Sequence, residues 1–234
     1  MKSCQWPPLE SDPEIFNKYF HSIGVPDNVY FKELLGLEYK EFMSIGGPVL
    51  GLIINFSRTD KKVTIPENSI KDPSFVPYFM KQTPDLDNAC GLIAGLHLFG
   101  NNTQVIKFTK DSMIQKFFDK AMSADSLQRA KDLEDFAQFK EVHNDFANQG
   151  QTELTNEEVN GHYICFINYQ DCLYELDGLK KGPYCVKENV KSDEFMDAAT
   201  KEIMRRVQEK EINEQISVMM CCDENSKVVD FFAD

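Results

Sequence analysis

Cys90 is the first residue whose type and position could do chemistry. It lies in the stretch TPDLDNACGLIAGLH, residues 83–97, just after the polar letters DLDN and just before an apolar helical pattern. This position predicts a helix N-terminus, where unpaired N–H groups and the helix dipole favour a thiolate. A cysteine among apolar residues also suits a buried core, and composition alone favours that packing role.

His97 follows Cys90 by seven residues but is poorly placed to serve it. In a helix, seven residues span about 10 Å along the axis. Proton transfer requires hydrogen-bond reach. We therefore expect His97 to be a structural residue on the helix face.

His162 and Asp177 form a second candidate pair, in the hairpin pattern HYICFIN, YQD, CLYELDG. If Gln170 and Asp171 make a two-residue turn, paired residue numbers sum to 341, and His162 and Asp177 are diagonal neighbours on one face. An aspartate there can orient an imidazole. A three-residue turn would shift the register by one and separate the two side chains, leaving Asp177 as part of a turn only. The chain order Cys, His, Asp is that of papain-like nucleophilic sites.

Hydrophobic periodicity predicts the elements that must position these residues. Helices are expected over residues 11–24, 90–100, 110–122, 126–146 and 192–210. Strands are expected over residues 48–57, 162–168, 172–178, 184–188 and 215–222. Helices early and strands late predict an α+β fold with an antiparallel sheet.

Two details add to this expected fold. The first helix should start with a capping box from Ser11 to Glu14 and stop at Gly24. The polar segment 147–160 is long for a loop in a compact domain, which is typical of a functional loop.

Composition limits the classes of protein. With 234 residues and 42% hydrophobic residues, the chain is expected to form one domain, 1–234. The 38 acidic and 25 basic side chains give a net charge of −13, which repels nucleic acid and anionic membranes and attracts basic partners. Without an apolar run of spanning length or a secretory signal, the protein is expected in the cytoplasm.

The seven cysteines include no C-x-x-C pair, which argues against a disulfide framework and against a zinc site. Cys221 and Cys222 are adjacent in the apolar run ISVMMCC. We expect them to point to opposite faces of a strand as packing residues.

Several motifs together resemble the ubiquitin C-terminal hydrolases, cysteine peptidases of the UCH type. They are WPPLESDPE, YFMKQ, NACG, GQTE, HYICFIN and LYELDG, and they extend over nearly the whole chain. The resemblance implies that Cys90 is the nucleophile, His162 the general base and acid, Asp177 the residue that orients His162, and Gln82 an oxyanion-hole donor.

The resemblance also implies a papain-like fold, with helices around a central antiparallel sheet and a knotted backbone. Residues 147–160 would be the crossover loop over the active site, and neither a metal nor an organic cofactor would be needed. The expected partner is ubiquitin, or a ubiquitin-like protein, whose basic tail suits the acidic chain. We expect a monomer in the cytoplasm, and also in the nucleus, that binds neither nucleic acid nor membranes.

The chain departs from the family pattern near Cys90. Gln82 lies eight residues before Cys90 instead of the usual six, which predicts a two-residue insertion within TPDLD. The second oxyanion donor is therefore open between Gln82 and Asn88, although Asn88 could instead cap the helix. The insertion is expected to bulge outward, with Asp85 and Asp87 facing solvent or a basic substrate.

Leu179 stands where many members of the family carry arginine, and we expect this to change a local contact only. The expected function is a thiol-dependent deubiquitinating hydrolase that cleaves small or flexible adducts from the C-terminal glycine of ubiquitin. One alternative is a weakly active or inactive ubiquitin-binding protein of the same fold. Another is a papain-like transferase with a Cys-His-Asp site.

Overall fold

The computed structural model describes residues 5–37, 48–64, 77–148 and 161–225. Its centre is a six-stranded sheet in the order β1-β6-β2-β3-β4-β5, in which each pair of neighbours is antiparallel. The strands are β1 (Val29–Glu33), β2 (Val49–Arg58), β3 (Gly161–Tyr169), β4 (Cys172–Leu176), β5 (Tyr184–Glu188) and β6 (Ile212–Asp223). The predicted α+β fold with an antiparallel sheet is confirmed.

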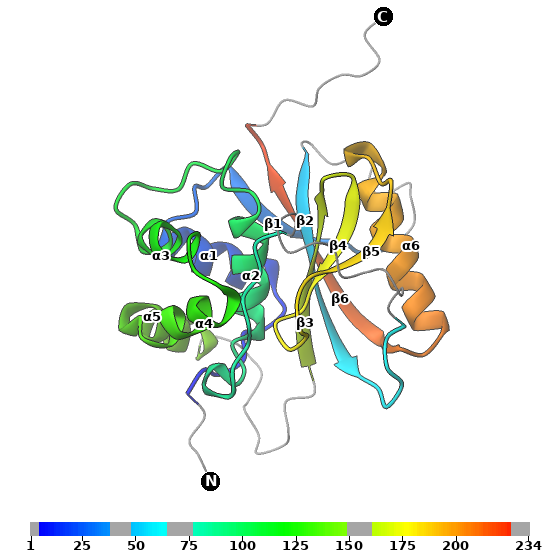
Figure 1. Cartoon of the computed structure of the whole chain (residues 1–234), viewed down its shortest axis with the longest axis horizontal. Coiled ribbons are helices and arrows are strands. Elements are labelled where there is room, and N and C mark those ends of the chain that lie inside the picture. Colours follow the sequence, from blue (N-terminus) through cyan, green and yellow to red (C-terminus); the bar gives the residue numbers. More distant parts are fainter. Residues whose placement is uncertain (1–4, 38–47, 65–76, 149–160, 226–234) are drawn as a thin grey trace, which may run out of the picture.

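Helices cover both faces of the sheet (Figure 1). One face carries α1 (Pro13–Ile23), α2 (Cys90–Gly100), α3 (Met113–Ala121), α4 (Ser126–Glu134) and α5 (Ala137–Ala147). The other face carries α6 (Phe195–Gln208), which the 3-10 turn η4 (Ser192–Glu194) precedes; a second 3-10 turn, η3 (Pro84–Leu86), precedes α2. Among the described residues, no helix is both long and apolar enough to cross a membrane.

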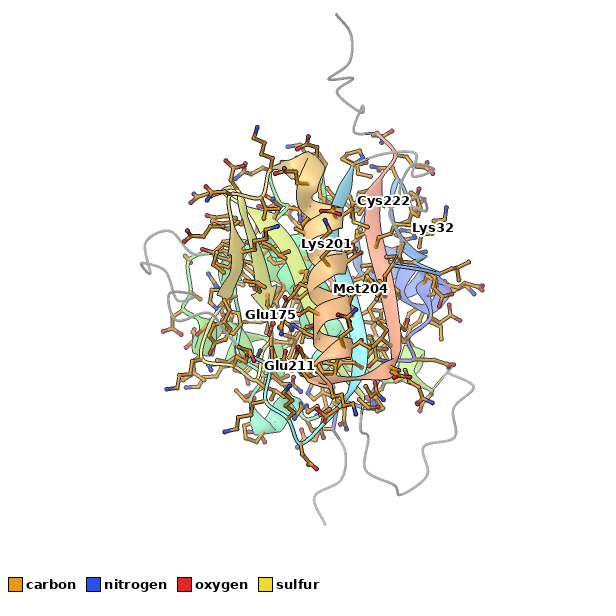
Figure 2. All side chains as sticks on the ribbon, turned by 90° about the vertical axis from the view of Figure 1, so that its right-hand side faces the viewer. Lys32, Glu175, Lys201, Met204, Glu211 and Cys222 are labelled. Atoms are coloured by element: carbon orange, nitrogen blue, oxygen red, sulfur yellow. The ribbon has the colours of Figure 1, made fainter. Side chains whose placement is uncertain are left out.

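Each face of the sheet packs against its own hydrophobic core. All residues of α2 are buried, and this helix lies against β3 in the larger core. Figure 2 shows α6 across the opposite face, with Cys222 of β6 beside it. Cys221 belongs to the first core and Cys222 to the second, because neighbouring residues of a strand alternate between faces. The expectation for this pair is confirmed.

The start of α1 differs from the predicted capping box. The N-cap is Asp12, whose side chain accepts a 2.6 Å hydrogen bond from the Glu14 N–H, and Pro13 is the first helical residue. Ser11 instead donates from Oγ to Oγ of Ser217, 3.0 Å away. Proline suits the first helical position because its missing N–H has no partner there, so the cap moves to the residue before it. The predicted stop is confirmed at Gly24, with a φ of 115°.

The predicted helix over 126–146 is interrupted. It is divided into α4 and α5 at Phe136, whose ψ of 82° is not helical. The break lets the rings of Phe136 and Phe139 pack edge to face at 5.1 Å. The sequence analysis also missed β1, an edge strand that pairs with β6 almost two hundred residues later.

Two expectations, the crossover loop and the knotted backbone, are still predictions. Of the crossover loop 147–160, residues 149–160 lie outside the described residues. The knotted backbone that the family resemblance implies is likewise still a prediction.

Candidate active site

Cys90 is the first residue of α2, as its sequence position predicted. It is 7% exposed, and its Sγ lies 3.9 Å from the backbone O of Asn88. The N-cap is Ala89, which makes no side-chain capping hydrogen bond, so Asn88 is not the cap that the sequence left open. The thiol therefore lies beside the first N–H groups of a helix, a position that favours an anion.

The hairpin between β3 and β4 has the two-residue turn. Gln170 and Asp171 have φ values of 50° and 56°, the left-handed backbone of a type I′ turn. Tyr169 pairs with Cys172, and the pairs continue in the register whose residue numbers sum to 341. The predicted register is confirmed, and the three-residue alternative is wrong.

This register brings His162 and Asp177 together. His162 Nε2 donates to Asp177 Oδ1 over 2.8 Å, and the Leu179 N–H donates to the same oxygen over 3.0 Å. The edge of the His162 ring contacts the Phe56 ring at a centroid distance of 6.0 Å. Both members of the pair are buried, at 3% and 7% exposure. The Cys90 side chain acts on the same imidazole, because it helps to raise the pKa of His162.

The electrostatics of the pair favour a charged imidazole. Burial alone would lower the pKa of His162, but hydrogen bonds with Asp177 and Cys90 outweigh it and raise the pKa from 6.5 to about 9. Burial would raise the pKa of Asp177, but the hydrogen bond and positive charge of His162 outweigh it, and the pKa is lowered. Each group thus stabilises the charged form of the other.

Gln82 lies close to this pair but faces another partner. Its backbone N–H donates to Gly178 O over 2.9 Å, which ties it to the residue after Asp177. Its side-chain Nε2 donates to the backbone O of Asp87 over 2.6 Å. Among the described residues, the buried Gln82 Oε1 has no hydrogen-bond partner. The amide that would serve an oxyanion is thus engaged with the chain's own backbone.

The segment with the predicted insertion, residues 83–87, bulges outward only in part. Asp85 is exposed, as expected. Asp87 was expected to face solvent, and this was wrong: its two carboxylate oxygens accept 2.9 Å hydrogen bonds from the backbone N–H groups of Gln5 and Trp6. The carboxylate supplies acceptors to a segment that would otherwise leave two donors unpaired.

His97 is a core residue, as expected. It is fully buried in α2 and stacks on Phe79 with ring centroids 5.1 Å apart. Its Nε2 lies within hydrogen-bond distance of the backbone N and O of Met80, at 3.0 and 3.1 Å. Burial lowers the pKa of His97 to about 4, so it is neutral at physiological pH.

One group near the site was missed by the sequence analysis. Glu175 of β4 is buried between Arg206 and Lys180, two residues before Asp177 in the chain. Arg206 lies on the apolar face of α6 together with Ala199 and Ile203, and an arginine in such a stripe was the available signal. No three His, Cys, Asp or Glu side chains gather to hold a metal ion in the part of the chain that the structure describes.

Comparison with known proteins gives the family. Residues 6–208 match the family model described as ubiquitin carboxyl-terminal hydrolase, family 1. Ubiquitin carboxyl-terminal hydrolase 3 of Arabidopsis thaliana is 34% identical over 187 residues, covering 77% of this chain and 79% of the relative. Ubiquitin carboxyl-terminal hydrolase isozyme L1 of Monodelphis domestica is 32% identical over 224 residues, covering 93% and 98% of the two chains.

A solved structure supports the fold. The catalytic domain of Trichinella spiralis UCH37, bound to ubiquitin vinyl methyl ester, matches with a TM-score of 0.71 at 22% identity. The match covers 94% of this chain and 97% of the other. The family model and the relatives show that this chain belongs to the ubiquitin carboxyl-terminal hydrolase family, family 1.

Proposed function

We propose that this protein is a thiol-dependent deubiquitinating hydrolase that uses Cys90, His162 and Asp177. The observation that carries the proposal is the 2.8 Å hydrogen bond from His162 to Asp177, beside a Cys90 at the start of α2 that helps to raise the pKa of His162. A nucleophile, a base and a residue that orients the base, each within hydrogen-bond reach, make up a nucleophilic triad. The relatives are named as ubiquitin carboxyl-terminal hydrolases, so we take ubiquitin as the protein whose C-terminus provides the acyl group.

The reaction would proceed in two halves. His162 holds the proton of Cys90, and the thiolate attacks the carbonyl carbon of the last glycine of ubiquitin. The C–N bond then breaks as the imidazolium protonates the leaving amine, and a thioester remains. Water attacks the thioester while His162 takes its proton, and Cys90 leaves as thiolate. Asp177 stabilises the imidazolium in both halves.

The developing oxyanion requires donors. The backbone N–H of Cys90, at the start of α2, is one candidate, since helix N-termini favour negative charge. Gln82 Nε2 carries two N–H groups: one donates to the Asp87 carbonyl, and the other is the candidate second donor. We propose that this second N–H binds the substrate oxygen when substrate is in place.

We further propose that the adducts removed are small or flexible. The family resemblance makes residues 147–160 a crossover segment, and such a segment would limit which leaving groups pass to Cys90. The excess of acidic side chains would speed encounter with a basic ubiquitin surface more than it would tighten binding. Ubiquitin with a short peptide should be cleaved faster than a ubiquitin dimer.

One observation favours a second candidate function. With Gln82 held by Asp87, an enzyme whose second amide N–H did not reach the substrate oxygen would bind ubiquitin and turn it over poorly. Such a protein would be a ubiquitin-binding member of the same fold.

Release of a fluorophore from a ubiquitin C-terminal amide separates the two functions. We expect a burst that is stoichiometric with Cys90, steady turnover after it, and covalent capture by ubiquitin vinyl methyl ester. Tight binding of ubiquitin without burst or capture would establish the second function. A third result, neither binding nor capture, would remove ubiquitin as the substrate.

A further inference from the structure

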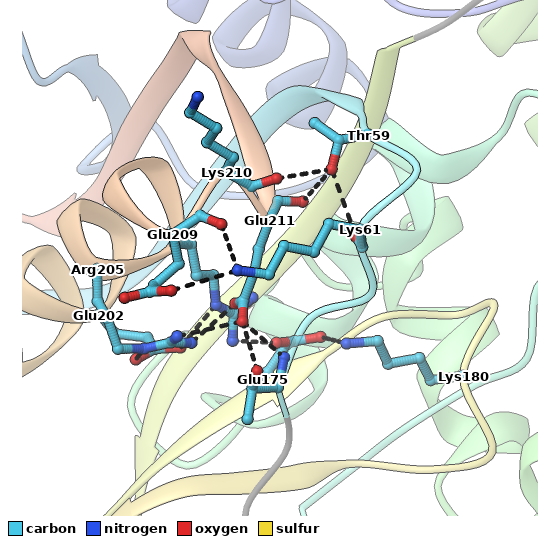
Figure 3. Close-up of polar contacts among 11 residues, drawn as sticks. Thr59, Lys61, Glu175, Lys180, Glu202, Arg205, Glu209, Lys210 and Glu211 are labelled. Atoms are coloured by element: carbon cyan, nitrogen blue, oxygen red, sulfur yellow. Dashed lines mark hydrogen bonds and ion pairs between the residues drawn. The ribbon is translucent and has the colours of Figure 1, made fainter.

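A row of buried ion pairs links α6 to the turn that carries Asp177 (Figure 3). Glu175 is at its centre and is 1% exposed. Glu175 Oε2 lies 2.5 Å from Nη2 of Arg206, and Oε1 pairs with Nζ of Lys180. In Figure 2, Glu175 lies beside α6 on the face of the sheet that this helix covers. The carboxylate therefore joins a helix to a turn.

The Arg206 end of this row is rigidly held. Arg206 is 2% exposed, donates from Nε to Glu202 over 2.7 Å, and lies over the ring of Phe166 at 5.2 Å. Burial alone would lower the pKa of Arg206, but Glu175 and Glu202 outweigh it and raise the pKa. A guanidinium with fixed partners on several sides gives Glu175 a fixed anchor.

The Lys180 end closes the turn itself. The Lys180 N–H donates to Asp177 O over 2.9 Å, and the Lys180 carbonyl accepts a hydrogen bond from Nζ of Lys81. Leu179, between them, is 46% exposed and contributes no packing that could fix the turn. The turn is thus held by charges and backbone bonds.

Glu175 and Asp177 lie on the same side of their segment. Alternate residues of a strand point the same way, and Asp177 directly follows the last residue of β4. Phe166, which pairs with Glu175, shares this side with His162, four residues earlier in β3. A shift of the Glu175 anchor would therefore be transmitted along this side toward the bond between Asp177 and His162.

Stability alone does not account for this arrangement. A buried ion pair is weak evidence for stability, because apolar residues of similar volume often stabilise a fold equally well. Fixing one geometry among several is the better-attested use of buried charges. Here the fixed geometry is that of the turn behind the candidate triad.

We propose that Glu175, anchored by Arg206 and paired with Lys180, positions Asp177 against His162. Glu175, Arg206 and Lys180 are positioning residues that touch neither substrate nor thiol. This inference rests on the proposed function and deepens it.

The test uses full-length protein and two variants. Lys180→Met removes the ion pair between Lys180 and Glu175 and leaves the backbone bonds of the turn in place. The pair of Glu175 and Arg206 stays intact, so we expect the fold to be retained. A double variant, Glu175→Gln with Arg206→Met, removes both charges of the buried pair together, and Glu202 keeps its ion pair with Arg205. Lys180→Arg restores the ion pair and should restore function.

We expect kcat on a ubiquitin C-terminal amide to fall about 10- to 100-fold in both variants with KM unchanged, since a misplacement of about 1 Å can cost about 100-fold. The downfield N–H resonance of His162, which reports its bond to Asp177, should weaken or shift in the same variants. Lys180→Arg should recover most of the wild-type kcat and of the wild-type His162 resonance. A merely structural pair would lower the melting temperature and leave the resonance in place.

Arg205→Met is the matched control. Arg205 belongs to the same group of charges but bridges Glu202 and Glu211, at 2.8 and 2.9 Å, on the side away from the turn (Figure 3). It should lower stability and leave kcat within about twofold, because Arg205 shares Glu202 with Arg206 but pairs with neither Glu175 nor Lys180.

Wild-type kcat and an unchanged resonance in Lys180→Met would overturn the proposal, whatever the double variant does. Equal losses of kcat in Arg205→Met and Lys180→Met would overturn it as well. Failure of the proposed function is a different result, because wild-type protein would then show neither turnover nor capture by ubiquitin vinyl methyl ester.

Discussion

The two halves of the candidate site are prepared to different degrees. In the hairpin half, His162 already donates to Asp177, and each group stabilises the charge of the other. In the half that precedes α2, the Gln82 amide donates to the Asp87 carbonyl and leaves its own buried oxygen without a partner among the described residues. Proton transfer is thus preorganised, whereas the oxyanion site depends on the second N–H of an amide whose first N–H already binds the chain's own backbone.

This difference follows from how each half is built. The hairpin is local, and its register is fixed by a two-residue turn and by alternating burial. The segment from Gln82 to Cys90 holds the insertion and is fixed by a distant contact, between Asp87 and the backbone of Gln5 and Trp6. A site that couples one preformed half to one adjustable half can hold its thiol ready and still depend on substrate for full activity.

The largest expected effect is at Cys90, where both halves meet. Cys90→Ala should abolish hydrolysis and retain ubiquitin binding, because it removes the nucleophile alone. Burst assays and calorimetric titration with ubiquitin measure the two properties. Cys165→Ala is the control: burial raises the pKa of Cys165, which remains a thiol in the core. Hydrolysis by Cys90→Ala would show that Cys90 is not the nucleophile.

The second-largest effect is expected at Asp177, in the hairpin half of the site. Asp177→Asn should lower kcat by about 1,000- to 10,000-fold, since the same substitution costs about 10,000-fold in a serine protease triad. KM should change little, because Asp177 acts on the imidazole and not on substrate binding. Steady-state kinetics on a ubiquitin C-terminal amide measure both constants. A loss of kcat below about threefold would mean that the bond to His162 does not matter for the reaction.

The hairpin is also where sequence reasoning succeeded. A two-residue turn and the alternation of side chains are local signals, and the register that they predict, with His162 beside Asp177, is confirmed. The contact of Asp87 with Gln5 and Trp6 joins residues more than eighty positions apart and leaves no periodic signal. Such pairings depend on tertiary packing, which also decided the break at Phe136 and the pairing of β1.

The adjustable half is tested by Gln82→Ala. If Gln82 turns to the oxyanion, its loss should lower kcat about 100-fold or more, the usual effect of removing one donor, with ubiquitin affinity unchanged. Asn88→Ala is the matched control, since it truncates a second amide side chain close to Cys90. The opposite result, a large loss in Asn88→Ala and a small one in Gln82→Ala, would transfer the donor role.

A smaller effect is expected at the anchor of the inserted segment. Asp87→Ala leaves two backbone N–H groups without their acceptor and should lower the free energy of unfolding by about 1–3 kcal/mol. Urea unfolding gives this value. Asp85→Ala, two residues earlier and exposed, should change it by less than about 0.5 kcal/mol. Equal losses in both variants would show that the contact with Gln5 and Trp6 does not fix the segment.

The last expected effect concerns the pH dependence of stability and compares two buried histidines. The pKa of His162 is raised from 6.5 to about 9, so its hydrogen bonds contribute stability that is complete below pH 6.5 and is lost as the pH rises through 9. Burial lowers the pKa of His97 to about 4, so the fold is instead destabilised as the pH falls from 6.5 toward 4. The site histidine and the core histidine therefore act at opposite ends of the pH range.

Urea unfolding at a series of pH values separates these contributions. His162→Gln should lose less stability than wild type between pH 6.5 and 9, because the variant has no imidazole that could release a proton over that range. The comparison is made on the alkaline side, because loss of His162 also alters the pKa of Asp177, which titrates on the acid side. Parallel alkaline curves for the two proteins would mean that Asp177 and Cys90 do not hold a proton on His162. The hairpin would then be no better prepared than the segment that carries Gln82.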